Sequence, residues 1–211
     1  MKNIKVLLVN GSPHKNGCTY TALTEAASAL EKNDVKTEIF HLGAKAIAGC
    51  IGCYACMKTG KCFMNDIVNE FIDKAFETDG FIFGSPVYFA SASGSLTSFM
   101  DRAFFSGLGR GVFGHKPAAA ITCARRAGTT ATFDQINKYF TICNMPVVSS
   151  QYWNMVHGTT PDEVRQDLEG MQTMRTLGNN MAWLLKSIEA GKASGIKIPE
   201  NEPRTSTNFI R

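Results

Sequence analysis

Short apolar runs alternate with longer amphipathic segments along most of the 211-residue chain. The short runs have the length of buried strands, and the longer segments repeat apolar side chains at the i, i+3 and i+4 spacing of helices. This pattern predicts five strands, at residues 4–9, 35–42, 80–85, 117–123 and 146–153. It also predicts five helices, at residues 19–32, 67–75, 95–105, 130–143 and 161–189.

Capping signals mark the start of two of these helices. Asn65 or Asp66 precedes one, and Thr160-Pro161-Asp162-Glu163 opens another with a capping Thr, a Pro at the first helical position and a Glu at the third. Strands that alternate with helices imply a parallel sheet covered on both faces, and right-handed crossovers make a doubly wound three-layer α/β sandwich the simplest topology. We expect one domain over residues 1–190 and an extended C-terminal arm over residues 191–211.

Composition narrows the class of protein. The chain is 44% hydrophobic and 19% charged with a formal net charge of +4, which is typical of a globular domain and excludes long disorder. No basic run has the length of a nucleic-acid or membrane-binding arm, and no window approaches the ~20 apolar residues of a spanning helix. The first apolar run is too short for a signal peptide. We therefore expect a cytoplasmic protein with neither nucleic-acid nor membrane partners.

Cysteine is the unusual component, with seven residues of which four fall between positions 50 and 62. Cys50, Cys53, Cys56 and Cys62 form a C-x2-C-x2-C-x5-C pattern. This compact spacing favours a [4Fe–4S] cluster. A zinc site, a Cys53/Cys56 redox pair and four cysteines without metal remain alternatives. The Cys-rich loop, residues 43–64, follows the second strand and should project from the end of the sheet where ligands bind.

The loop after the first strand carries the features of a phosphate site. It matches neither GxGxxG nor the P-loop pattern. Ser12, Asn16 and Thr19 place polar side chains before a helix N-terminus, whose free N–H groups and dipole favour an anion. A strand-to-helix turn that is rich in small residues for geometric reasons alone also fits this loop.

Two further loops converge on the same edge of the predicted sheet. Pro86, Val87, Tyr88 and Phe89 follow the third strand, where the aromatic pair suits the wall of a flat ring, although two core aromatics fit as well. Arg125 and Arg126 follow the fourth strand and suit the electron-rich edge of a reduced flavin, or a solvated face. Together, the three loops match a mononucleotide with a large ring, namely FMN.

The stretches GSPHKNGCT, GSPVYF and PVVSSQYWNMVHG, in this order of strands and helices, resemble the flavodoxin-like NADPH-dependent FMN reductases. The cysteine spacing resembles their iron–sulfur flavoprotein branch. The resemblance implies FMN with its phosphate in the first loop, including His14 and Cys18, and its ring against the second. It also implies a homodimer or a dimer of dimers. His14 and Cys18 differ from the longer cation and the Asn or Ser that are more usual there.

The chain shows no Ser-His-Asp arrangement and no paired loop carboxylates, so we assign no catalytic side chain. In a flavin enzyme the cofactor supplies the reactive atoms. The sequence predicts an FMN-dependent oxidoreductase in which NAD(P)H or ferredoxin supplies electrons to FMN and to the [4Fe–4S] cluster, for a small acceptor such as a quinone or nitro compound. The alternative is an electron carrier that exchanges electrons with protein partners, followed by a flavin-binding regulatory module.

Overall fold

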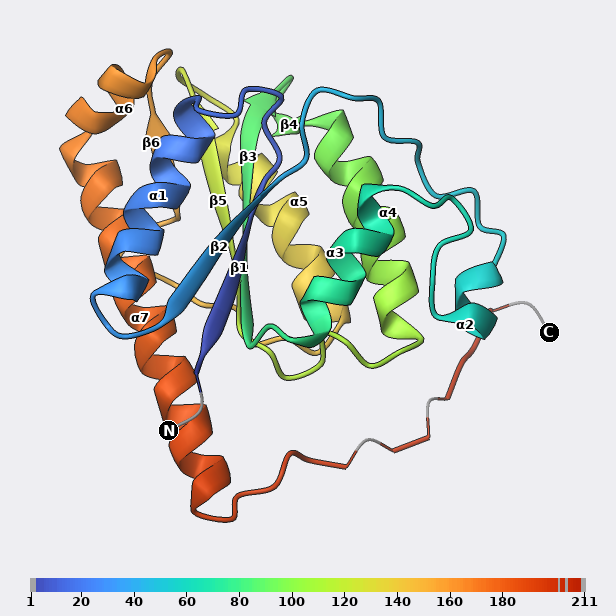
Figure 1. Cartoon of the computed structure of the whole chain (residues 1–211). Coiled ribbons are helices and arrows are strands. Elements are labelled where there is room, and N and C mark those ends of the chain that lie inside the picture. Colours follow the sequence, from blue (N-terminus) through green and yellow to red (C-terminus); the bar gives the residue numbers. More distant parts are fainter. Residues whose placement is uncertain (1–2, 201, 204, 210–211) are drawn as a thin grey trace.

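The computed structural model describes residues 3–200, 202–203 and 205–209. A central twisted sheet has helices on both sides (Figure 1). The strands are β1 (Lys5–Asn10), β2 (Lys36–His41), β3 (Gly80–Tyr88), β4 (Ser91–Ala92), β5 (Ala118–Ala124) and β6 (Met155–His157). The helices are α1 (Cys18–Glu31), α2 (Ala55–Thr59), α3 (Ile67–Phe76), α4 (Gly94–Leu108), α5 (Thr129–Ile142), α6 (Pro161–Gln166) and α7 (Leu168–Ala193).

The sheet has the strand order β2-β1-β3-β5-β6, and all neighbours on this path run parallel. The chain moves to one side of β1 to form β2 and to the other side to form β3. This reversal leaves a crevice at the carboxyl ends of β1 and β3, which is where open α/β sheets bind ligands. The predicted doubly wound three-layer fold is confirmed.

The two faces of the sheet are packed differently. Helices α3, α4 and α5 cover a face rich in phenylalanine, whereas α1, α6 and α7 cover a face of aliphatic side chains and methionine (Figure 1). Alternate residues of one strand reach opposite faces, as Phe81 and Ile82 do. Each fully buried side chain of this size contributes about 1.5–3 kcal/mol, so both layers hold the sheet edge in place. No helix in the described part of the chain is long and apolar enough to cross a membrane.

The last strand lies later in the chain than the sequence pattern predicts. The segment 146–153 touches β5 through a single bridge, Ala118 to Val147, and the regular strand is Met155–His157. Between them the Ser150 hydroxyl donates to the Tyr152 carbonyl oxygen at 2.6 Å and to Asn154 Oδ1 at 2.7 Å. These local bonds replace the ladder with a loop, which serine favours because its hydroxyl competes for backbone groups.

The predicted single helix at 161–189 is two helices. Its start is confirmed, because Thr160 and Glu163 form a reciprocal capping box. The helix breaks at Asp167, whose carboxylate accepts from the Gly170 N–H at 2.9 Å and the His157 N–H at 2.7 Å. Asp167 therefore begins α7, and α7 continues to Ala193, beyond the predicted end. The described residues from Ile196 onward form neither helix nor strand.

Candidate functional site

We call the segments that follow β1, β3 and β5 at one end of the sheet the candidate flavin edge. Its first loop, after β1, is held by hydrogen bonds of buried polar groups. Asn10 ends β1 fully buried, accepting from the Ser12 N–H at 3.1 Å and donating to the Lys15 carbonyl at 3.2 Å. The Ser12 carbonyl lies 3.0 Å from His41 Nε2, at the end of β2. In the structure, this contact ties the second strand to the loop.

Helix α1 begins directly after this loop with its first amides free for a ligand. Its N-cap is Gly17, no side chain caps it, and no acidic residue occupies its first turn. The N–H groups of Cys18, Thr19 and Tyr20 have no acceptor within the helix, since Thr21 is the first residue to bond back, to Gly17. This end of α1 suits a phosphate group.

The predicted loop residues around this end of α1 do not all face one way. Ser12 and Thr19 are buried, Cys18 is half-buried, and His14 is exposed. The Ser12 hydroxyl already accepts from the His14 N–H at 3.2 Å. Asn16 lines a separate cavity of about 380 Å³ that also involves Tyr20, Arg165 and Met171.

The second segment of the site is a hairpin, which corrects the expectation of a plain loop after residue 85. Pro86, Val87 and Tyr88 extend β3, and the chain then turns back antiparallel into β4. Phe89 and Ala90 at the tip have φ of 52° and 56°, the left-handed pair of a type I′ turn. Phe89 is fully exposed and Tyr88 about half exposed, so the hairpin carries aromatic surface beyond the sheet edge.

Glycine at position 128 lets the third segment touch this hairpin. Gly128 has φ of 92°, and a Cβ there would lie 2.7 Å from the Ala90 Cα and 2.9 Å from Val87 Cγ1. The preceding Arg125 and Arg126 are exposed at the same edge. The structure thus brings the three predicted segments together after β1, β3 and β5.

Helix α4 links this edge to the cysteines. The Ser93 hydroxyl caps α4, accepting from the Leu96 N–H, and donates to the Gly11 carbonyl at 2.8 Å. Arg102 and Ser106 lie eight and twelve residues beyond Gly94, about 12–18 Å along the helix axis. The cysteine segment therefore descends along the flank of α4, rather than projecting from the edge as expected (Figure 1).

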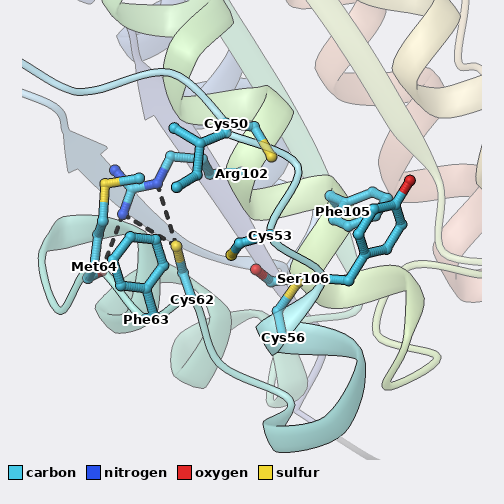
Figure 2. Close-up of a pocket in the computed structure, with 11 residues that line it drawn as sticks. Cys50, Cys53, Cys56, Cys62, Phe63, Met64, Arg102, Phe105 and Ser106 are labelled. Atoms are coloured by element: carbon cyan, nitrogen blue, oxygen red, sulfur yellow. Dashed lines mark hydrogen bonds between the residues drawn. The ribbon is translucent and has the colours of Figure 1, made fainter.

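The four clustered cysteines surround one pocket beside α4, as Figure 2 shows. Left-handed residues at Gly52, Tyr54 and Gly60 turn the chain around it. Tyr54 packs edge-on against Phe105 of α4 with ring centres 5.5 Å apart. The pocket is lined by Cys50, Ile51, Cys53, Tyr54, Cys56, Cys62, Phe63, Met64, Arg102, Phe105 and Ser106.

Four thiols in an apolar pocket match the donor set of an iron–sulfur cluster. All seven cysteines of the chain are free thiols. The pocket has a volume of about 20 Å³, room for a water molecule rather than a cluster. Within residues 3–200, 202–203 and 205–209, no three Cys, His, Asp or Glu side chains are arranged to hold a metal ion. The residues fit a cluster in chemistry, because four thiols from one short segment line one pocket.

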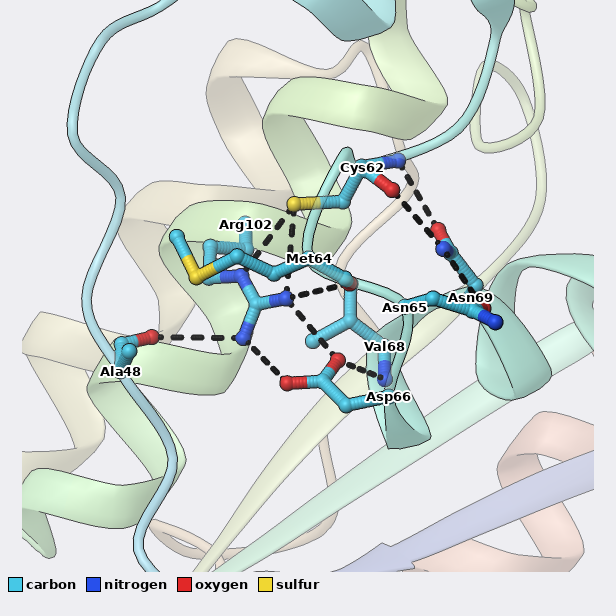
Figure 3. Close-up of polar contacts among 8 residues, drawn as sticks. All are labelled: Ala48, Cys62, Met64, Asn65, Asp66, Val68, Asn69 and Arg102. Atoms are coloured by element: carbon cyan, nitrogen blue, oxygen red, sulfur yellow. Dashed lines mark hydrogen bonds and ion pairs between the residues drawn. The ribbon is translucent and has the colours of Figure 1, made fainter.

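Cys62 is the most firmly held of the four. The Asn69 side chain accepts from the Cys62 N–H and donates to the Cys62 carbonyl, both at 2.9 Å (Figure 3). The Cys62 sulfur lies 3.4 Å from both Nε and Nη2 of Arg102. Asp66 caps α3 by accepting from the Val68 N–H at 3.1 Å. Asp66 also forms a two-point ion pair with Arg102, at 2.7 and 2.9 Å.

Comparisons with known proteins identify relatives of this chain. The sequence model of the family described as NADPH-dependent FMN reductase matches residues 4–160. An iron–sulfur flavoprotein of Methanocaldococcus jannaschii is 35% identical over 194 residues, covering 88% of this chain and 100% of that protein.

This chain belongs to the iron–sulfur flavoprotein branch of the NADPH-dependent FMN reductase family. An iron–sulfur flavoprotein of Clostridioides difficile is 40% identical over 125 residues, which cover 58% of this chain and 55% of that protein. The match thus spans about half the length of that relative. A flavodoxin, WrbA-like protein from Agrobacterium tumefaciens superposes with a TM-score of 0.62 at 16% identity, covering 89% and 99% of the two chains, and supports the flavodoxin-like fold.

As a member of this flavoprotein family, the chain is an FMN-binding oxidoreductase.

The other three cysteines of the chain, Cys18, Cys123 and Cys143, lie apart from the cysteine pocket. Burial, followed by the neighbouring Cys18 thiol, raises the pKa of Cys123 to about 12. Burial raises the pKa of Cys143 to about 11. Both thiols therefore stay protonated near neutral pH, which suits residues of the hydrophobic core.

Several residues that shape the site are absent from the sequence-based prediction. Asn69 and Arg102 sit on amphipathic helices, where a polar residue usually faces solvent, and Ser93 directly precedes α4, yet all three are buried. Asp66 was predicted as a helix cap, and its second role with Arg102 has no local signal. Asp101 and Arg102 are both charged residues between Met100 and Ala103, and no local signal indicates that Arg102 is buried whereas Asp101 is exposed.

Proposed function

We propose that this flavoprotein transfers electrons from NAD(P)H or ferredoxin through FMN and a [4Fe–4S] cluster to a small acceptor such as a quinone or nitro compound. The observation that carries the proposal is the convergence of Cys50, Cys53, Cys56 and Cys62 on one apolar pocket. That pocket lies on the helix that begins at the flavin edge. The names of the relatives, which are iron–sulfur flavoproteins, support the same assignment.

The proposed FMN position follows from the free groups of the edge. The uncapped amides of α1, with the hydroxyls of Ser12 and Thr19, would hold the phosphate. The hairpin that carries Tyr88 and Phe89 would border the ring, and Arg125 and Arg126 would favour negative charge near it. FMN supplies the hydride and electron chemistry, and these residues bind and orient it.

We further propose a homodimer or dimer of dimers in the cytoplasm. Ile51, Tyr54, Met57 and Phe63 around the cysteine pocket are each more than half exposed. Clustered exposed apolar side chains are typical of interaction surfaces. Free, closely spaced thiols persist in reducing compartments. Sedimentation of the holoprotein at low micromolar concentration tests the assembly, and a monomer would contradict it.

The central experiment is an anaerobic preparation of the full chain, with flavin, iron and acid-labile sulfide quantified on one sample. We expect one FMN and the iron and sulfide of one cubane cluster per chain. A Cys62→Ala variant should lose the iron and keep the flavin, whereas the buried Cys143→Ala control should keep both. Flavin without iron in the wild-type protein would reject the cluster, and zinc in its place would favour a structural metal.

Kinetic measurements on the same preparation identify the electron donor and the electron acceptor. Steady NADPH oxidation with a quinone acceptor supports the enzyme. Reduction by ferredoxin alone, without nicotinamide turnover, favours the electron-carrier alternative.

A further inference from the structure

Arg102 is a fully buried cation whose side chain is held on several sides. It lies on α4 with 1% of its side chain exposed. Two of its nitrogens pair with the Asp66 carboxylate, and two carbonyl oxygens, those of Ala48 and Met64, accept from it at 3.4 and 3.0 Å (Figure 3). The remaining N–H, on Nε, points at the Cys62 sulfur, and Nη2 also lies 3.4 Å from that sulfur.

The arrangement exceeds what charge neutralisation requires. A buried guanidinium needs a carboxylate partner, and Asp66 supplies it from a position where its own side chain is 38% exposed. Two additional contacts, from Nε and Nη2, converge on one sulfur at 3.4 Å. Although burial disfavours its charge, the hydrogen bonds and charges of Asp66 and Cys62 raise the pKa of Arg102, which remains a cation.

We propose that Arg102 is a positioning residue for the proposed cluster. Arg102 orients the Cys62 sulfur as a cluster ligand and raises the reduction potential of the cluster. This inference rests on the proposed function. Reduction adds one electron, and so one negative charge, without making or breaking a bond. A fixed cation that directs its Nε–H at a ligating sulfur, with Nη2 also 3.4 Å away, stabilises that added charge. Hydrogen bonds to sulfur are among the factors that set such potentials.

Arg110 provides a matched control. It also contacts the cysteine segment, donating to the Gly60 carbonyl at 3.4 Å, and its guanidinium lies 4.0 Å above the Phe76 ring. Arg102 and Arg110 therefore both tie residues 48–60 to the protein body. Of these two arginines, Arg102 has guanidinium nitrogens 3.4 Å from a cysteine sulfur, whereas Arg110 contacts the Gly60 carbonyl and the Phe76 ring. A comparison of the two separates the effect on sulfur from general support of the segment.

The experiment compares wild type, Arg102→Met, Arg102→Lys and Arg110→Met as anaerobic holoproteins. The readouts are iron loss to a chelator and the cluster midpoint potential in a dithionite titration followed by electron paramagnetic resonance. The FMN content and FMN potential of each variant report on the intact fold. Removal of a residue that orients a metal ligand typically weakens metal binding by about 10–100-fold.

We expect Arg102→Met to lose iron about 10–100-fold faster than wild type and to have a more negative cluster potential, with FMN unchanged. Arg102→Lys keeps the positive charge but loses the planar array of guanidinium N–H groups. Iron loss from this variant should therefore be fast, and its cluster potential should be closer to that of the wild type. Arg110→Met should match wild type in potential.

Wild-type iron retention and potential in a flavin-loaded Arg102→Met would overturn the inference while leaving the cluster proposal intact. If Arg102→Met does not fold, wild-type values of both readouts in Arg102→Lys overturn it instead. Wild-type protein that holds FMN without iron rejects the cluster itself, and the role of Arg102 with it.

Discussion

The proposed flavin edge and the cysteine segment are built in contrasting ways. At the flavin edge, backbone groups of neighbouring strands bond directly, as Gly11 N–H does to the Gly84 carbonyl at 2.9 Å. Residues 48–60 leave the sheet and are tied to the protein body by arginine side chains that donate to the Ala48 and Gly60 carbonyls. Backbone hydrogen bonds of the sheet hold the conformation of the edge, whereas the conformation of the cysteine segment depends on a few side-chain contacts. FMN binding should therefore survive changes that disrupt the cysteine pocket.

Thiol chemistry offers the largest expected difference between the two regions. In iron-free protein at about pH 8, iodoacetamide should alkylate the exposed Cys53 at least about 100-fold faster than Cys143, whose pKa burial raises to about 11. The Cys143 rate should rise with pH until about pH 11, as its thiolate forms. Time-resolved peptide mass spectrometry measures both rates, and equal rates would contradict the assigned burial.

Substitution of Asn69 tests how much the cysteine segment depends on one side chain. Asn69→Ala removes both bonds to the Cys62 backbone, which should cost about 1–3 kcal/mol because buried polar groups lose their partners. Iron should be lost about 10-fold faster, as expected for a ligand-orienting residue. FMN affinity should not change.

Chelator kinetics and flavin titration measure the two effects of Asn69→Ala. Asn33→Ala, which removes an amide bonded to Ala29 and Asn179, is the control and should leave iron retention unchanged. Equal iron loss in the two variants would show that Asn69 does not support the cluster ligand.

FMN binding at the flavin edge should instead be sensitive to changes in backbone conformation. Gly128→Ala places a Cβ 2.7 Å from the Ala90 Cα at a left-handed φ, which should cost about 1–3 kcal/mol and weaken FMN binding about 10-fold. Iron content should stay at the wild-type level. Gly191→Ala, where the nearest atom is at 3.5 Å, should leave both unchanged. Thermal unfolding and FMN titration provide the measurements.

The smallest effect is expected at Ser93, which joins the flavin edge to the helix beside the cysteines. Ser93→Ala removes the α4 cap and the bond to Gly11, costing about 1 kcal/mol with a several-fold loss of FMN affinity. Thr160→Ala removes the cap of α6 and should cost a similar amount without changing FMN affinity. Denaturant unfolding and FMN titration compare the variants. Equal FMN affinity in both would remove Ser93 from the flavin edge.

Local patterns predicted most of the fold and the segments that form both regions. Apolar periodicity placed β1, β2, β3 and β5 and the helices α1, α3, α4 and α5, because burial of one face imposes its period on the chain. The cap at Asp66 was also predictable from local sequence, because a helix N-terminus requires a nearby hydrogen-bond acceptor. The break at Asp167 was missed because its carboxylate also accepts from the distant His157 N–H, a tertiary bond with no trace in the local pattern.

The sequence by itself determined the parallel α/β class, the family, and the four-cysteine spacing, since each is written in short-range order along the chain. Tertiary structure alone decided that Phe89 and Ala90 turn through left-handed conformations, and that the cysteine pocket lies down the flank of α4. It also decided that Arg102 meets Cys62 across 40 residues of sequence. A buried cation takes whichever partners the packed helices bring to it, and that choice exists only once the chain has folded.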